Sequence, residues 1–167
     1  INQISRYAKI GIHPSYGSYL KPKQLDKEIE RLNSITDNEV SLSRKHFLKL
    51  SIPETYRNLE KAGITNDYSM GYADDIGFRA SICTPYTFFD VLQNKCLNVK
   101  IHPFAYMDGT LNVYLGLSIA DAKEKVASLK QQVKEVGGVF IGIWHNETVN
   151  DRGIWKGWRA VYEEAIT

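Results

Sequence analysis

Apolar residues recur at helical spacing in four segments, which we predict to be helices. They span residues 21–35, 53–62, 118–136 and 157–166. The third segment carries the longest stripe, begins at Ser118, a good N-cap, and ends at Gly137 and Gly138, which suit a helix stop. The stripe consists of Ile119, Ala122, Val126, Leu129, Val133 and Val136.

Short runs typical of β-strands lie between the predicted helices. They span residues 7–12, 41–47, 65–70, 97–101 and 139–144. This alternation of strands and helices favours a parallel α/β sheet, either open or rolled into a barrel. Residues 71–95 break the rhythm with glycines, a proline and many aromatic residues, and we predict an ordered loop or a short hairpin over one end of the sheet.

Composition and charge indicate an ordinary globular protein and argue against some classes of binding partner. The 167 residues fit one domain, and 43% hydrophobic and 24% charged residues are ordinary for a globular protein. A net charge of +2 without a basic stripe argues against nucleic acid and anionic membranes as partners. The apolar runs are too short for a membrane span. Cys83 and Cys96 fit two reduced thiols, so we expect a cytoplasmic protein.

All four histidines follow predicted strands, where functional groups of parallel α/β folds collect. They are His13, His46, His102 and His145. A single histidine at a strand end is more often structural, because residue type alone does not define a site. Four on one predicted face indicate a metal site or an acid–base site, since imidazole binds zinc and titrates near neutrality.

Two other groups of residues are weaker candidates. Asp74 and Asp75 form an adjacent carboxylate pair, which in a loop is usually solvated because only one side chain can point inward. Several aromatic residues flank the predicted strand ends, and most of them fit core or loop packing. One or two exposed rings would suit stacking on sugars. These aromatic residues are Tyr16, Tyr86, Trp144, Trp155 and Trp158.

Several short motifs, taken in order, resemble those of the polysaccharide deacetylases (carbohydrate esterase family 4). Residues 11–16, Gly-Ile-His-Pro-Ser-Tyr, resemble the family's histidine motif, and residues 43–47, Ser-Arg-Lys-His-Phe, its arginine motif. Residues 65–74 lie where the family has an aspartate and aromatic motif. Residues 143–146, Ile-Trp-His-Asn, resemble its closing motif. Nearly the whole chain is similar to a bacterial deacetylase-like group, including Gly-Phe-Arg at 77–79 and Trp-Lys-Gly-Trp at 155–158.

The resemblance implies an α/β fold of a particular kind, an incomplete or distorted (β/α) barrel of the polysaccharide deacetylase type. Residues 1–167 would form a single domain, the C-terminal portion of such a barrel, truncated at its N-terminus. The implied function is that of a metal-dependent hydrolase which removes N- or O-acetyl groups from a carbohydrate. The implied cofactor is a divalent metal, with zinc as the expected ion.

The same resemblance assigns roles to individual residues. His145 would be the catalytic acid that protonates the leaving group, and Arg44 would orient the base or hold the developing charge. His13 would be a metal ligand. His46 also ends a predicted strand, and we expect it to supply the second imidazole ligand. The substrate groove would include Tyr16, Trp144 and Asp74.

Two departures from the family pattern change the expectation for this chain. Gly17 stands where the family has its second histidine, and the family's aspartate pair would precede Ile1. We therefore expect residues 1–167 alone to be inactive and to self-associate through the exposed barrel edge, since unpaired strand edges attract partners. Two alternatives stay open. One is a catalytically degenerate, carbohydrate-binding or structural domain of the same fold, and the other is a different α/β hydrolase or isomerase with a histidine-rich site.

Overall fold

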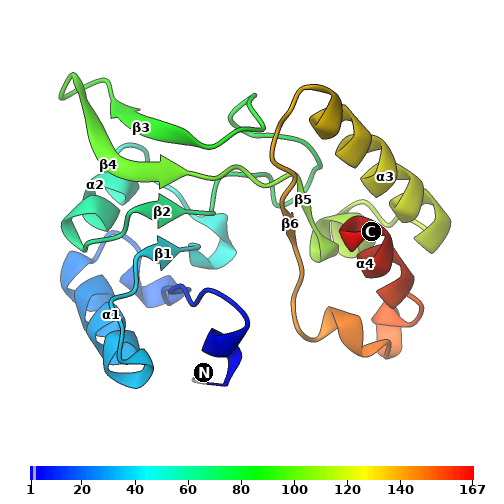
Figure 1. Cartoon of the computed structure of the whole chain (residues 1–167), viewed down its shortest axis with the longest axis horizontal. Helices are drawn as coiled ribbons and strands as arrows, with labels where there is room; N and C mark the ends of the chain where they lie inside the picture. The colour runs from blue at the N-terminus through cyan, green and yellow to red at the C-terminus, as the bar shows by residue number, and fades with distance from the viewer. Residues whose placement is uncertain (2) are drawn as a thin grey trace. The chain divides into compact units, whose positions relative to one another are not determined.

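The structure is a computed structural model that describes residue 1 and residues 3–167. Contacts divide the chain into two compact units (Figure 1). The first unit comprises Ile1–Ser69 and Pro85–His102, and the second comprises Met70–Thr84 and Pro103–Thr167. Each unit contains helices and a small sheet and is described by itself.

The first unit is built on a sheet whose strand order is β1-β2-β4-β3 (Figure 1). Strands β1, β2 and β4 are parallel, and β3 pairs with β4 in the antiparallel direction. Ile12 adds a single parallel bridge to Ser43 at the outer edge of β1. The strands are β1 (Leu42–Ser43), β2 (Asn66–Asp67), β3 (Tyr86–Asp90) and β4 (Lys95–Ile101).

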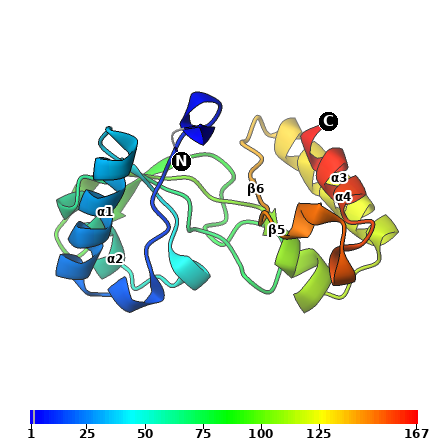
Figure 2. The same ribbon diagram turned by 90° about the horizontal axis from the view of Figure 1, so that it is seen from below.

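Two α-helices connect the parallel elements of the first unit. Helix α1 (Pro22–Thr36) lies in the chain between Ile12 and β1, and α2 (Glu54–Lys61) lies between β1 and β2. Both are seen in Figure 2. Gly63 adopts a φ of 79° and ends α2, because the left-handed conformation closes the last turn at no steric cost to glycine. Three short 3₁₀ turns complete the unit: η1 (Ile4–Arg6), η2 (Tyr16–Ser18) and η3 (His46–Leu48).

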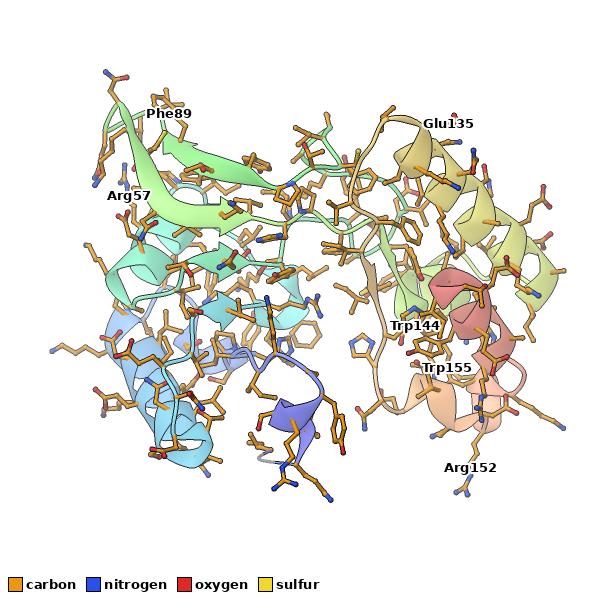
Figure 3. All side chains as sticks on the ribbon, viewed as in Figure 1. Arg57, Phe89, Glu135, Trp144, Arg152 and Trp155 are labelled. Atoms are coloured by element: carbon orange, nitrogen blue, oxygen red, sulfur yellow. The ribbon has the colours of Figure 1, made fainter. Side chains whose placement is uncertain are left out.

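The core of the first unit follows the alternation of β4. Leu97, Val99 and Ile101 are almost completely buried, whereas the residues between them are exposed, as a strand with one covered face requires. Helix α2 packs on this strand. Arg57 of α2 also donates two hydrogen bonds to the fully buried carboxylate of Asp90, at 2.5 and 2.9 Å (Figure 3). This ion pair ties the helix to the β3–β4 hairpin.

The second unit pairs two short parallel strands with two longer helices. Strand β5 (Tyr106–Met107) pairs with β6 (Gly142–Ile143). Helices α3 (Ile119–Glu135) and α4 (Arg159–Ile166) lie side by side in both views (Figures 1 and 2). The shorter turns are η4 (Thr110–Tyr114), a π-helix, and the 3₁₀ turns η5 (Thr148–Asn150) and η6 (Gly153–Trp155). The buried core cluster is Ala105, Tyr106, Leu111, Ala122, Val126, Trp158 and Val161.

The mixed α/β class predicted from the sequence is confirmed, and the helices begin and end within two residues of their predicted bounds. Ser118 caps α3 as predicted, because its hydroxyl accepts a hydrogen bond from the amide of Asp121. The predicted apolar stripe of α3 stops short of its end, since Val136 is 69% exposed. Strands β1, β2 and β6 are shorter than predicted, β4 begins two residues earlier than predicted, and residues 7–12 contribute only the bridge at Ile12.

The predicted hairpin within residues 71–95 is present in part, as β3, which pairs with the following strand β4. Strand β5 was not predicted. The single-domain assignment stays a prediction. In the part of the chain that the structure describes, no helix is both long enough and apolar enough to cross a membrane.

Candidate metal and proton-transfer sites

Three of the four histidines lie at the carboxyl edge of the sheet of the first unit. His13 follows the bridge residue Ile12, His46 lies three residues beyond β1, and His102 follows β4 directly. Because these strands are parallel, their carboxyl ends share one edge, as the sequence predicted. His145 belongs to the second unit.

His13 and His46 face each other across a single hydrogen bond. His13 Nε2 and His46 Nδ1 are 2.8 Å apart, and the two ring centroids are 4.8 Å apart. His13 Nδ1 lies 2.7 Å from the carbonyl oxygen of Arg44. A carbonyl can only accept, so His13 carries its proton on Nδ1, and its Nε2 lone pair accepts the Nδ1–H of His46.

Backbone pairing sets up this arrangement. The Ile12 amide donates to the Leu42 carbonyl, and the Arg44 amide donates to the Ile12 carbonyl. Gly11 permits this close approach, because a Cβ there would lie 2.9 Å from the Cβ and carbonyl oxygen of Leu42. His13 is therefore held beside the carbonyl of Arg44.

Two exposed aromatic rings lie beside the histidine pair. Phe47 is 75% exposed and packs edge-on against His46 and Tyr16. Its φ of 53° is uncommon for a residue with a large side chain and costs on the order of 1–3 kcal/mol. Tyr16 is also exposed, and its hydroxyl accepts a hydrogen bond from Lys49. The two rings form an apolar surface next to the imidazoles.

A buried carboxylate lies at the end of β2. Asp67 is completely buried and accepts hydrogen bonds from the amide and the hydroxyl of Ser69. Burial raises the pKa of Asp67 to about 6, although the hydrogen bonds from Ser69 and the charge of Lys45 act in the opposite direction. Burial also lowers the pKa of Arg44, and the negative charge of Asp67 offsets part of this decrease.

Arg44 itself points towards Tyr68 and not into solvent. Its Nε donates to the Tyr68 carbonyl at 3.3 Å, and its guanidinium carbon lies 5.9 Å from the centroid of the Tyr68 ring. His102 stacks on the same ring, with centroids 4.4 Å apart, and its Nε2 donates to Asn66 Oδ1 at 2.8 Å. Burial lowers the pKa of His102, and the positive charges of Lys100 and Lys9 lower it further. His102 therefore fits a neutral, structural histidine.

The second unit supports its histidine differently. His145 Nδ1 lies 2.7 Å from Asp108 Oδ1, and the His145 amide donates to Asp108 Oδ2 at 2.6 Å. Asp108 is fully buried, whereas the His145 side chain is 52% exposed. A carboxylate can only accept, so Nδ1 carries a proton and Nε2 is left as the outward nitrogen. Asp108 and His145 form a dyad suited to proton transfer.

Two predicted groove residues, Trp144 and Asp74, belong to the second unit. Trp144 is partly buried, donates its indole N–H to the Tyr106 hydroxyl at 3.1 Å, and packs edge-on against Tyr162 of α4 (Figure 3). Burial raises the pKa of Tyr106 to about 12. The contacts of Trp144 are those of a packing residue. Asp74 lies exposed in its loop, as expected for a solvated carboxylate.

The hollow found in the first unit lies away from the histidines. It is lined by residues 5–10 and 38–42, together with Thr36 and Asn66. Leu42 and Asn66 begin β1 and β2, so the hollow lies near the amino ends of these strands.

Sequence reasoning missed Asp108, Thr148 and Phe47. Asp108 follows the unpredicted strand β5, and its one sequence signal was an acidic residue directly before a glycine. Thr148 carried no signal of its own, and Phe47 was noted only as the last residue of the segment that resembles the arginine motif. Across residue 1 and residues 3–167, no group of three or more His, Cys, Asp or Glu side chains is placed to hold a metal ion. Comparisons with protein-family models, curated proteins and solved structures found no match.

Proposed function

We propose that this chain belongs to a metal-dependent carbohydrate deacetylase whose parallel strands are part of an incomplete (β/α) barrel. The observation that carries the proposal is the facing pair His13 and His46. A metal-binding histidine usually donates its second ring N–H to a carbonyl or carboxylate, which fixes the tautomer and aims the lone pair. His13 has this arrangement, because its Nδ1–H is held by the Arg44 carbonyl.

The distance between the two imidazoles fits a shared ion after a small adjustment. Two nitrogens bound tetrahedrally to one zinc, each at about 2.0–2.1 Å, lie about 3.3 Å apart. His13 Nε2 and His46 Nδ1 are 2.8 Å apart, so the rings need to separate by about half an ångström. His46 must also move its proton from Nδ1 to Nε2. Such an ion would activate water and polarise the acetyl carbonyl of the substrate.

The other residues have roles that follow from their contacts. His145 would protonate the leaving nitrogen or oxygen, because its outward Nε2 can carry a proton while Asp108 holds Nδ1. Arg44 would act mainly by holding His13 through its carbonyl, since its guanidinium is directed to Tyr68. Tyr16 and Phe47 would offer ring faces to a sugar, because aromatic rings commonly stack on apolar sugar faces.

The direct test is zinc binding followed by acetate release. Isothermal titration of the chain with zinc should show one site, and ¹⁵N NMR should show the His46 proton moving to Nε2. The complete encoded protein should then release acetate from N-acetylated oligosaccharides, and removal of zinc with a chelator should stop the release. Acetate release that survives complete removal of metal would overturn the proposal.

A further inference from the structure

The buried carboxylate of Asp108 is held by more groups than the histidine it faces. Its Oδ1 accepts from the Gly109 amide at 2.7 Å and from His145 Nδ1. Its Oδ2 accepts from the His145 amide and from the Thr148 hydroxyl, both at 2.6 Å. Thr148 is the only side chain other than His145 that donates to this carboxylate among the described residues.

Thr148 is 1% exposed and its position is fixed by the turn that follows His145. Its amide donates to the His145 carbonyl at 3.1 Å, and its hydroxyl lies 2.8 Å from the same oxygen. The hydroxyl proton therefore lies between two acceptors that belong to the dyad, Asp108 Oδ2 and the His145 carbonyl. A buried hydroxyl at such a point restricts rotation of the carboxylate.

We infer that Thr148 is a positioning residue for His145: its hydroxyl fixes the Asp108 carboxylate so that Oδ1 holds Nδ1–H and Nε2 remains the reactive nitrogen. The inference rests on the proposed role of His145 in proton transfer. Without the hydroxyl, Oδ2 keeps only the backbone amide of His145. The carboxylate can then rotate, and the imidazole is no longer held in one tautomer.

The structure offers a matched control in the same unit. Thr110 is also fully buried, and its hydroxyl donates to a backbone carbonyl, that of Ala73, at 2.7 Å. Thr110→Val removes a buried threonine hydroxyl that does not touch Asp108. Both valine variants should lose stability, Thr148→Val more than Thr110→Val, because the Thr148 hydroxyl donates to a carboxylate and the Thr110 hydroxyl to a neutral carbonyl. Only Thr148→Val should change His145.

The experiment records the side-chain ¹⁵N shifts of His145 at about pH 9, above the ordinary titration range of histidine. In the unmodified protein and in Thr110→Val, Nδ1 should be protonated and Nε2 unprotonated. In Thr148→Val the Nε2-protonated fraction should rise several-fold, and Thr148→Ser should restore the original spectrum. An unchanged spectrum in folded Thr148→Val would overturn the inference.

Activity then separates this inference from the proposed function. In the complete encoded protein with zinc, kcat for acetate release should fall about tenfold or more in Thr148→Val with KM little changed, since slight misplacement of a catalytic group is costly. Thr148→Ser should recover most of the rate. If no acetate is released by the unmodified protein, the proposed function fails, whereas the spectra still decide the role of Thr148. If Thr148→Val does not fold, a failure of Thr148→Ser to keep the Nδ1-protonated form overturns the inference.

Discussion

Each of the two units places a histidine just beyond a short stretch of parallel pairing, but the groups around the imidazole differ. In the first unit, His13 is held by a carbonyl and turns its lone pair towards His46. In the second unit, His145 is backed by the buried carboxylate of Asp108 and turns its other nitrogen outward. The position of a histidine at a strand end therefore makes it a candidate functional residue. The group that accepts its Nδ1–H then indicates whether it is suited to bind a metal or to transfer a proton.

His102 supplies the third case of the comparison. It also follows a parallel strand, but its Nε2 is taken by Asn66 and its ring stacks on Tyr68. Both histidines directly follow predicted strands, and in the sequence only the motif around His13 distinguishes the two. A histidine satisfied by a neutral amide has no lone pair or proton directed at a ligand through that nitrogen, so it serves as an internal control.

The largest effect should come from breaking the dyad of the second unit. In the complete encoded protein, His145→Ala should lower kcat for acetate release by about 10²–10⁴-fold, the usual contribution of a general acid. Zinc affinity should stay within about twofold of the original value, because no ligand is lost. Acetate release and zinc titration of the same preparation give both values. A variant with normal turnover would remove His145 from the mechanism.

Local signals in the sequence were sufficient to predict the helices. Ser118 and Gly137 mark the ends of α3 by chemistry that acts within one turn, and the apolar spacing marks its buried face. The strands gave weaker signals, because β1, β2, β5 and β6 each pair over only two residues. Two residues cannot show the alternation that identifies a strand.

The candidate site was predictable only in part. His13 and His46 could be proposed as neighbours, because both follow β-type runs of a parallel pattern. Asp108 could not be linked to His145, which lies 37 residues later, since their contact depends on the pairing of β5 with β6. Phe47 is exposed and has a left-handed backbone, and no residue-type preference predicts that conformation for phenylalanine.

The next prediction concerns Asp67, whose buried carboxylate has fewer donors than that of Asp108. Asp67 accepts two hydrogen bonds from Ser69, whereas Asp108 accepts four hydrogen bonds. Burial raises the pKa of Asp67 from 3.8 to about 6, so the folded protein binds this proton more tightly than the unfolded chain. The contribution of Asp67 to the free energy of unfolding should fall as pH rises from about 4 to 6, by on the order of 3 kcal/mol.

Asp67→Asn should remove this pH dependence. Urea unfolding of the unmodified protein and of Asp67→Asn, at several values between about pH 4 and 8, gives the difference between their free energies of unfolding. The contributions of the other carboxylates are the same in both proteins and cancel in this difference. The difference should shift in favour of the asparagine variant as pH rises and become constant above the titration of Asp67. Parallel curves for the two proteins would show that Asp67 is not perturbed in this way.

The smallest effect, and the one that tests the comparison most directly, concerns zinc affinity in the first unit. His13→Ala and His46→Ala should each weaken zinc binding by at least about 10–100-fold, because loss of a ligand should cost no less than loss of a group that orients one. His102→Ala should leave the zinc affinity unchanged, since His102 Nε2 is hydrogen-bonded to Asn66 and its ring stacks on Tyr68. Isothermal titration of the three variants measures the zinc affinity of each.

Gly17 allows a second experiment, which adds an imidazole, because a Cβ there would meet only Ser15 Oγ, at 3.7 Å. If an imidazole at position 17 can replace that of His46, Gly17→His should restore binding in the His46→Ala protein. Normal zinc binding by His46→Ala alone would show that the His13–His46 contact is only a hydrogen bond, and the contrast between the two units would then rest on His145.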